Sequence, residues 1–499
     1  MQGKQLTNRF VRGSASSMLA ILVSMAALLV TGKLVAVSFS KDMVGMLALM
    51  LVSADCLNLL LSLGLPVSMP RLIAAAEAQQ RPVLTRSAVA LLGWTVAASG
   101  LAALLLMMCT KCVPAVPSVS VLALVSAPHY IILLWLLAVS GTSRDLLMSI
   151  LAGLDLYTTR AASVAMTSLL QVALVAGAIQ VDRQTITWLV LAMVLSYFVS
   201  VAWMGAKLRV GWRVYGHFRP VRSTMDNIRG MLRFSWPLYA NQLLTFFYQR
   251  FDTVLVSALM GLAPAAVFEM VKRLPMVMTR ILGAGLTPYL PHLTRLIATD
   301  DKSGAARLAE RSARITACMG YAAALAVIVF REPVVRLLFS SEYLSGTGTL
   351  ALLLSSAVIA LQTGVMGQTL IAMGRNVAVT IINIGLVAVG LAMNVVLIPL
   401  FGMDGAGWAS VTAIAFSGVL QACWVRRHGI PVRWAAVLLP HAVFALACLP
   451  PLLADSVALR LSGIALFVTL SFALGVVTPG EIRQAADALR PSGGNAMEP

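Results

Sequence analysis

One strongly apolar stretch of the chain, residues 265–288, carries regularly spaced charges that could bind an anion. Glu269, Arg273 and Arg280 follow one another at intervals of four and seven residues, which places them on one face of an α-helix. Arginine presents a planar fork of N–H donors that matches the oxygens of a phosphate group. The spacing therefore predicts a cationic stripe that could hold a phosphate-bearing ligand.

Further polar and charged side chains lie in neighbouring apolar stretches. The candidate substrate-binding residues are Lys33, Gln242, Tyr248, Arg250, Arg273 and Arg280, and the candidate ion-coupling or charge-network residues are Asp55, Asp252 and Glu269. Charges are costly inside a bilayer, about 2.5 to 3.5 kcal/mol on insertion scales, so those that remain there usually face a cavity and have a function. The set predicts a charged cavity between helices.

Structural interpretations of the same residues remain open. Arg250 could pair with Asp252, or Glu269 with Arg273, so that an ion-pair network stabilises the helices. Lys33 lies near a helix end and could extend to the membrane surface. Lys272 is turned by about 100° from the Arg273 stripe, which is typical of a rim charge.

Asp55 has no obvious cation near it in the sequence and lies close to the middle of an apolar stretch. Such a carboxylate could take up a proton or a sodium ion during transport. Alternatively, it could pair with Arg250 or Arg280 across a cavity.

No metal, organic cofactor or other prosthetic group is expected. His129 and His441, each directly after a proline, are expected to be structural.

The composition indicates a membrane protein. Of 499 residues, 59% are hydrophobic and only 11% are charged, against about a quarter charged in soluble domains. Long unbroken apolar runs predict an all-α polytopic membrane protein with about 14 transmembrane helices. The predicted spans are 14–39, 43–64, 87–108, 119–139, 161–181, 186–206, 234–260, 265–288, 314–330, 349–373, 377–400, 403–424, 434–453 and 457–477.

The predicted topology explains where the basic residues behind the net charge of +18 are located. Of the 37 Lys and Arg residues, 26 fall on one set of alternate loops, 6 fall on the other, and 5 fall inside spans. Basic residues near span ends stay in the cytoplasm, so both termini are predicted to be cytoplasmic. Arg144 and Asp145 are assigned to a cytoplasmic loop after the fourth span. Nucleic-acid binding is not expected, because no aromatic residues interleave a basic groove.

A weak internal repeat indicates two lobes. Residues 64–72 and 285–293 match at four of nine positions with a constant offset of 221. An even-numbered repeat is related by an axis along the membrane normal, so we expect two six-helix lobes with pseudo-two-fold symmetry, plus two C-terminal helices. The expected parts are an N-lobe at 1–206, a basic cytoplasmic linker at 207–233, a C-lobe at 234–428, helices 13 and 14 at 429–480 and a cytoplasmic tail at 481–499.

The second half of the chain contains motifs that are similar to those of a known family. They are Leu337-Leu338-Phe339-Ser340-Ser341-Glu342-Tyr343, then Ala372-Met373-Gly374-Arg375-Asn376, and the run from Asn394 to Ala409 with Gly405-Ala406-Gly407, supported by Arg250-Phe251-Asp252 and by Ala152 to Tyr157. Together they resemble the polysaccharide transporter (O-antigen flippase) family of the multidrug/oligosaccharidyl-lipid/polysaccharide flippase superfamily.

The resemblance implies a flippase of the bacterial cytoplasmic (inner) membrane. It would move an undecaprenyl-pyrophosphate-linked oligosaccharide, an O-antigen or exopolysaccharide repeat unit, from the cytoplasmic to the periplasmic leaflet by alternating access. The expected partners are this lipid-linked oligosaccharide, the lipid bilayer and the polysaccharide polymerase machinery. Such a protein serves lipopolysaccharide and other polysaccharide biosynthesis.

Three alternatives remain. A lipid II flippase would carry a more basic first helix than Lys33 provides, and a multidrug cation antiporter would favour an acidic or aromatic cavity. A membrane polysaccharide polymerase or ligase would typically have a large outer loop, whereas the loops predicted outside are short. No HExxH, Walker or Ser/His/Asp signature is present, so we expect the protein not to be an enzyme.

Overall fold

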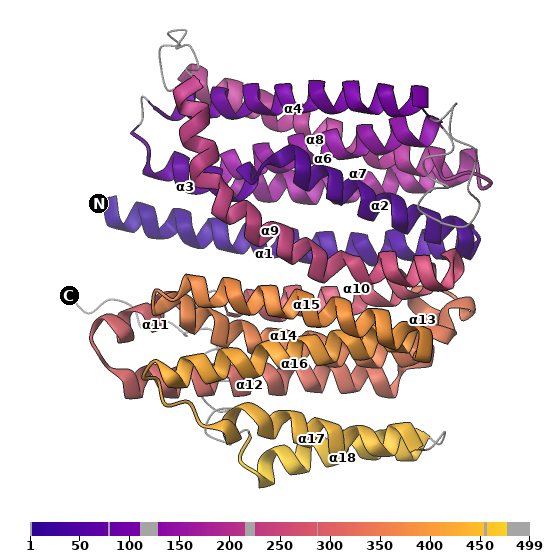
Figure 1. Cartoon of the computed structure of the whole chain (residues 1–499), viewed down its shortest axis with the longest axis vertical. Helices are drawn as coiled ribbons and strands as arrows, with labels where there is room; N and C mark the ends of the chain where they lie inside the picture. The colour runs from indigo at the N-terminus through magenta and orange to yellow at the C-terminus, as the bar shows by residue number, and fades with distance from the viewer. Residues whose placement is uncertain are drawn as a thin grey trace, which may run out of the picture. The chain divides into compact units, whose positions relative to one another are not determined.

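The computed structural model describes residues 2–77, 80–109, 128–214, 225–286, 288–453 and 457–476, and in this part of the chain it contains helices and no strands (Figure 1). The predicted tail at 481–499 and the linker residues 215–224 lie outside it. The helices of the first half are α1 (Gln2–Ser38), α2 (Lys41–Ser62), α3 (Leu65–Ala75), α4 (Arg81–Cys109), α6 (Pro128–Gly153), α7 (Tyr157–Val181), α8 (Thr187–Val214), α9 (Met225–Met260) and α10 (Leu262–Ala284).

The second half continues with short and long helices in alternation. They are α11 (Tyr289–Ala298), α12 (Lys302–Val329), α13 (Arg331–Leu338), the 3-10 helix η1 (Ser341–Gly346), α14 (Thr347–Ala372), α15 (Asn376–Phe401), α16 (Met403–Arg427), α17 (Trp434–Leu453) and α18 (Val457–Ala473).

The long helices confirm the predicted fold class. Ten helices in the described residues are long and apolar enough to cross a membrane, and α17 and α18 contain shorter apolar runs. The helices α9 and α10 are also long, at 36 and 23 residues, but polar and charged side chains interrupt their apolar surface. The chain is an all-α, multi-pass membrane protein, in agreement with about fourteen spans.

The chain divides into two compact units. Unit 1 comprises Met1–Arg273, Val335–Gly346 and Leu391–Ala406, and unit 2 comprises Leu274–Val334, Thr347–Gly390 and Gly407–Pro499. The division falls inside α10, whereas the lobes expected from the sequence were separated at the linker 207–233.

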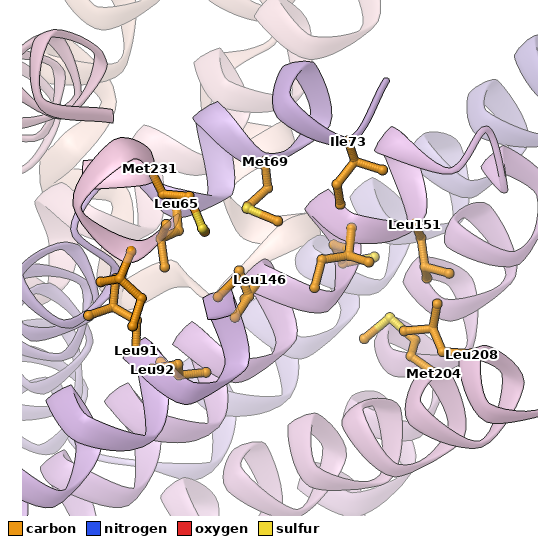
Figure 2. Packing of buried hydrophobic residues seen from close by; sticks show 14 residues of the cluster. Leu65, Met69, Ile73, Leu91, Leu92, Leu146, Leu151, Met204, Leu208 and Met231 are labelled. Atoms are coloured by element: carbon orange, nitrogen blue, oxygen red, sulfur yellow. The ribbon is translucent and has the colours of Figure 1, made fainter. Parts of the chain in front are cut away.

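Unit 1 contains a core between α3, α4, α6, α8 and α9. Figure 2 shows Leu65, Met69 and Leu146 gathered between neighbouring helices of this core. At Gly153, a Cβ atom would lie 2.8 Å from Cβ of Ile73, so α6 and α3 approach closely at this glycine. The core thus extends to the end of α6.

The position of α6 corrects the predicted fourth span, 119–139. The helix runs from Pro128 to Gly153 and is long and apolar enough to cross a membrane, so Arg144 and Asp145 lie inside this helix and not in a loop. The sequence beyond Asp145 remains helical because Leu146 and its apolar neighbours are buried in the core of unit 1.

Both copies of the repeat fall where a long helix ends and a short one begins. Gly64 has a φ of 77°, a left-handed conformation that suits glycine, and it separates α2 from α3. The second copy begins at Gly285, directly after α10 ends, and leads into α11. The repeated pattern therefore marks a break between a long helix and a short helix in each half of the sequence.

The segment 335–346, here called the strap, packs in unit 1 although it lies between α12 and α14 in the sequence. Val335, Phe339 and Tyr343 recur every four residues and are fully buried. At Gly346, a Cβ atom would lie 2.7 Å from Cγ1 of Val267, which belongs to α10. The strap thus covers part of the first half of α10.

Unit 2 has its own core and its own polar contacts. One cluster of buried hydrophobic residues includes Tyr289 and Leu293 of α11, which pack against α12 and α14. The hydroxyl of Tyr289 lies 2.8 Å from that of Thr369, and Tyr321 forms a hydrogen bond with His441. This contact gives His441 a partner in the core, consistent with a structural role.

Candidate functional site

Arg250 lies at the centre of a charge cluster formed by α2, α9 and α10. Its Nη2 is 2.7 Å from Oδ2 of Asp55, and its Nη1 donates to Oε1 of Glu269 at 3.3 Å. The structure thus brings together three of the residues predicted from the sequence. It also assigns Asp55 a cation, one of the two that the sequence left open.

Asp252 and Lys272 form a second pair between α9 and α10. Nζ of Lys272 lies 2.7 Å from Oδ1 and 2.8 Å from Oδ2 of Asp252, and it also donates to the carbonyl of Gln249. The Lys272 side chain is only 13% exposed, so it belongs to the buried network and not to a rim. The alternative pair of Arg250 with Asp252 does not form.

Arg273 occupies the middle of α10, about 16 Å from either helix end at 1.5 Å per residue. It is 9% exposed, and its Nη1 donates to the carbonyl of Leu28 on α1 at 3.0 Å. Among the described residues, no carboxylate lies within 4.0 Å of its nitrogen atoms, because Glu269 pairs with Arg250. The alternative pair of Glu269 with Arg273 is therefore not formed.

A glycine on α1 makes room for this guanidinium. At Gly32, a Cβ atom would lie 2.5 Å from Nη1 of Arg273, closer than real Cβ contacts. No local pattern in the sequence selects Gly32, because the contact joins positions far apart in the chain.

The other predicted residues lie apart from this centre. Arg280 is exposed on the part of α10 that belongs to unit 2, and Lys33 is exposed on α1, where Nζ donates to the carbonyl of Leu337 in the strap. Gln242 and Tyr248 are half-buried on α9, and Oε1 of Gln242 is buried without a partner among the described residues.

A polar cluster that sequence reasoning missed joins α2, α6 and α8. Asn58 donates to Asp145 at 3.2 Å and accepts from the Thr142 hydroxyl at 2.8 Å. Arg144 lies 3.7 Å from Asp145 and stacks over the ring of Tyr197 at 4.7 Å. A proline at the first turn of a helix is a common start signal, so Pro128 could have placed the span later in the sequence.

The strap contributes a second residue that the sequence did not identify as part of a site. Tyr343 is fully buried, and its hydroxyl has no hydrogen-bond partner among the described residues. Unit 1 therefore holds a cation that no described carboxylate pairs and a buried hydroxyl that has no described hydrogen-bond partner.

Comparison with solved structures identifies the fold. The chain is similar to the lipid II flippase MurJ in an inward closed conformation, with a TM-score of 0.65 and 11% identity, over 96% of this chain and 100% of that one. It is similar to a mutant of the Vibrio cholerae MATE transporter VcmN, with a TM-score of 0.57 and 16% identity, over 85% and 97% of the two chains.

A MOP superfamily transporter from Pyrococcus furiosus also has this fold, with a TM-score of 0.53 and 14% identity, over 84% of this chain and 95% of that one. No curated protein matches the sequence. Residues 10–296, more than half of the chain, match the family described as polysaccharide biosynthesis protein. The chain therefore belongs to the polysaccharide biosynthesis protein family.

Proposed function

We propose that the protein is a flippase that moves an undecaprenyl-pyrophosphate-linked oligosaccharide from the cytoplasmic to the periplasmic leaflet. The observation that carries this proposal is Arg273, a cation in the middle of α10 whose charge no described carboxylate pairs. A buried, unpaired charge is expensive. An anionic headgroup that visits the membrane interior would supply the missing countercharge.

The neighbouring charges suit a supporting role. Arg250 already binds two carboxylates, Asp55 and Glu269, so it is less available to a phosphate than Arg273 is. Asp55 is 43% exposed although it lies in a spanning helix, and an exposed carboxylate at that depth favours a water-filled space over lipid. Uptake of a proton or sodium ion by Asp55 would release Arg250 and could couple transport to an ion gradient.

The remaining predicted residues would line the path of the headgroup. Gln242 and Tyr248 lie on α9 and Arg280 lies on α10, two of the three helices that form the charge cluster, and Lys33 lies beside Gly32 on α1. With both termini in the cytoplasm of a bacterial inner membrane, an anion that moves outward gains about 2.3 kcal/mol per charge per 100 mV of inside-negative potential. Delivery to a polysaccharide polymerase would follow for an O-antigen or exopolysaccharide unit.

A lipid II flippase is the second candidate, because the solved structure that resembles this fold over 96% of the chain is the lipid II flippase MurJ. Both substrates carry a polyprenyl pyrophosphate, so Arg273 would serve either of them. Rescue of cells depleted of their peptidoglycan flippase would favour lipid II. Restoration of surface polysaccharide alone would favour the first candidate.

The proposal is tested by deleting the gene in its host and supplying variants at equal membrane levels. Arg273→Gln should abolish surface polysaccharide, because the neutral side chain cannot balance the headgroup charge. Arg183→Gln, at the end of α7 and away from the cluster, is the matched control and should restore the wild-type amount. Normal surface polysaccharide with Arg273→Gln would contradict the proposed site.

A further inference from the structure

Two buried polar groups of unit 1 retain unused hydrogen-bonding capacity. The Tyr343 hydroxyl has no partner among the described residues, and Arg273 makes one described hydrogen bond, to the carbonyl of Leu28. A guanidinium carries five N–H donors, so four of them bond to no described residue. Buried polar groups in native proteins are nearly always hydrogen-bonded, and both groups therefore point to a ligand that supplies acceptors.

The two groups belong to one place in the fold. Tyr343 lies in the strap, and the strap packs against α10 through Gly346, where a Cβ atom would lie 2.8 Å from Cγ1 of Val271. The strap also contacts α1 beside Gly32, because Nζ of Lys33 donates to the carbonyl of Leu337. Arg273 and the strap therefore meet α1 at neighbouring residues, Gly32 and Lys33.

The orientation of the guanidinium is fixed from the α1 side. The carbonyl of Leu28 holds Nη1, and Gly32, one turn further along α1, leaves the space that Nη1 occupies. Any larger residue at Gly32 would displace the guanidinium. Gly32 is therefore a positioning residue for Arg273.

We propose that Arg273 and Tyr343 form a single phosphate subsite, with Gly32 positioning the guanidinium. The arginine fork would donate to two oxygens of one phosphate group, and the Tyr343 hydroxyl would donate to a third. A carboxylate has only two oxygens, which the fork would already occupy, so three donors favour phosphate. This inference rests on the proposed function for its substrate, the pyrophosphate of a polyprenyl-linked sugar.

The test uses the purified full-length protein in detergent with farnesyl pyrophosphate as the probe. A ligand that binds the folded state raises the midpoint of thermal unfolding, and at a fixed ligand concentration the rise is larger for tighter binding. Tyr343→Phe removes only the hydroxyl and should weaken binding about tenfold, the usual effect of losing a hydrogen bond to a charged group. Without probe, the variant should unfold no earlier than the wild type, because the lost hydroxyl has no described partner.

Matched controls separate a binding role from a structural one. Tyr321→Phe also removes a buried hydroxyl, but one that bonds to His441, so it should unfold earlier and bind the probe normally. Gly32→Ala should weaken binding, whereas Gly93→Ala in α4, where a Cβ atom would meet nothing within 4 Å, should not. Equal binding of Gly32→Ala and Gly93→Ala would refute the positioning role.

The outcomes distinguish this inference from the proposed function. If Tyr343→Phe binds like the wild type while Arg273→Gln does not bind, Tyr343 is no part of the subsite and the proposed function stands. If the wild type binds farnesol as tightly as farnesyl pyrophosphate, the protein recognises the lipid chain and both proposals fail. Loss of binding in Tyr343→Phe and Gly32→Ala, with both controls intact, supports the subsite.

Discussion

The buried ion pair of unit 1 differs from the ion pairs of unit 2 in how far its two partners are exposed. In unit 1, Lys272 and Asp252 pair well inside α10 and α9, and both side chains are largely buried. In unit 2, Arg433 binds Glu310 at 2.8 Å from a position just before α17, and the Arg433 side chain is 77% exposed although that of Glu310 is 10% exposed. Exposed pairs contribute little to stability, whereas removing one partner of a buried pair is costly.

The second pair of unit 2 repeats this arrangement. Arg460 lies 3.3 Å from Glu332, and these residues stand near the first turns of α18 and α13. In both pairs of unit 2, the more exposed partner lies at or beside a helix end. The difference indicates that the ion pairs of unit 2 link neighbouring helices near their ends. The charges of unit 1 lie within apolar helices, where a charge is costly unless it is paired or has a function.

The largest effect is expected from breaking the buried pair of unit 1. Lys272→Met leaves Asp252 without its cation and should lower the free energy of unfolding by about 3–5 kcal/mol. The double variant Lys272→Met/Asp252→Leu should recover most of this loss, because no uncompensated charge remains. Thermal unfolding in detergent measures both. If the double variant is as unstable as the single one, the loss of stability does not come from an uncompensated buried charge, and the proposed difference between the two units is wrong.

A smaller effect is expected at the polar cluster of α6. Asp145→Leu leaves Arg144 without its carboxylate and Asn58 without an acceptor, but Asp145 is 40% exposed and solvent screens the interaction. We expect a loss of about 1 kcal/mol in the free energy of unfolding. Asp42→Leu, at the start of α2, is the control and should change stability less. A loss as large as that of Lys272→Met would show that α6 carries a second, equally buried site.

The smallest effect is expected at Asp301, which caps α12 in unit 2. Its carboxylate accepts hydrogen bonds from the Gly304 backbone and from Ser303, which hold its pKa below the ordinary value of 3.8. A lowered pKa contributes stability that is complete above pH 3.8 and is lost as the pH falls through the folded-state pKa. Asp301→Ala should therefore lower the unfolding midpoint slightly at pH 7. The difference in unfolding midpoint between the variant and the wild type should become smaller in acid. A difference that does not change with pH would contradict the capping role of the Asp301 carboxylate.

Local patterns in the sequence predicted much of the fold. Apolar runs located most spanning helices, and the interval between Arg273 and Arg280 was sufficient to predict their shared helix face. The fourth span was wrong because Arg144 and Asp145 resembled the charged end of a loop. Their apolar neighbours, such as Leu146, are held in α6 by a core that forms only when α3 and α8 pack against them.

The partners of the charges could not be predicted in the same way. Three carboxylates and three cations lie in the apolar segments of α2, α9 and α10 up to Arg273, and helical spacing allows several pairings among them. Asp55 meets Arg250 across 195 positions of sequence. Such a choice depends on which helices are neighbours, information that no local spacing contains.

The sequence by itself determined the elements: apolar length made helices long enough to span a membrane, and the spacing of Glu269, Arg273 and Arg280 placed them on one face of α10. Only the tertiary structure decided that Arg250 and Lys272 are paired, that Arg273 has no described carboxylate partner, and that Gly32 borders its guanidinium. The physical reason is range. Hydrophobic periodicity acts within one helix, whereas desolvation and pairing of a charge depend on helices brought together by folding.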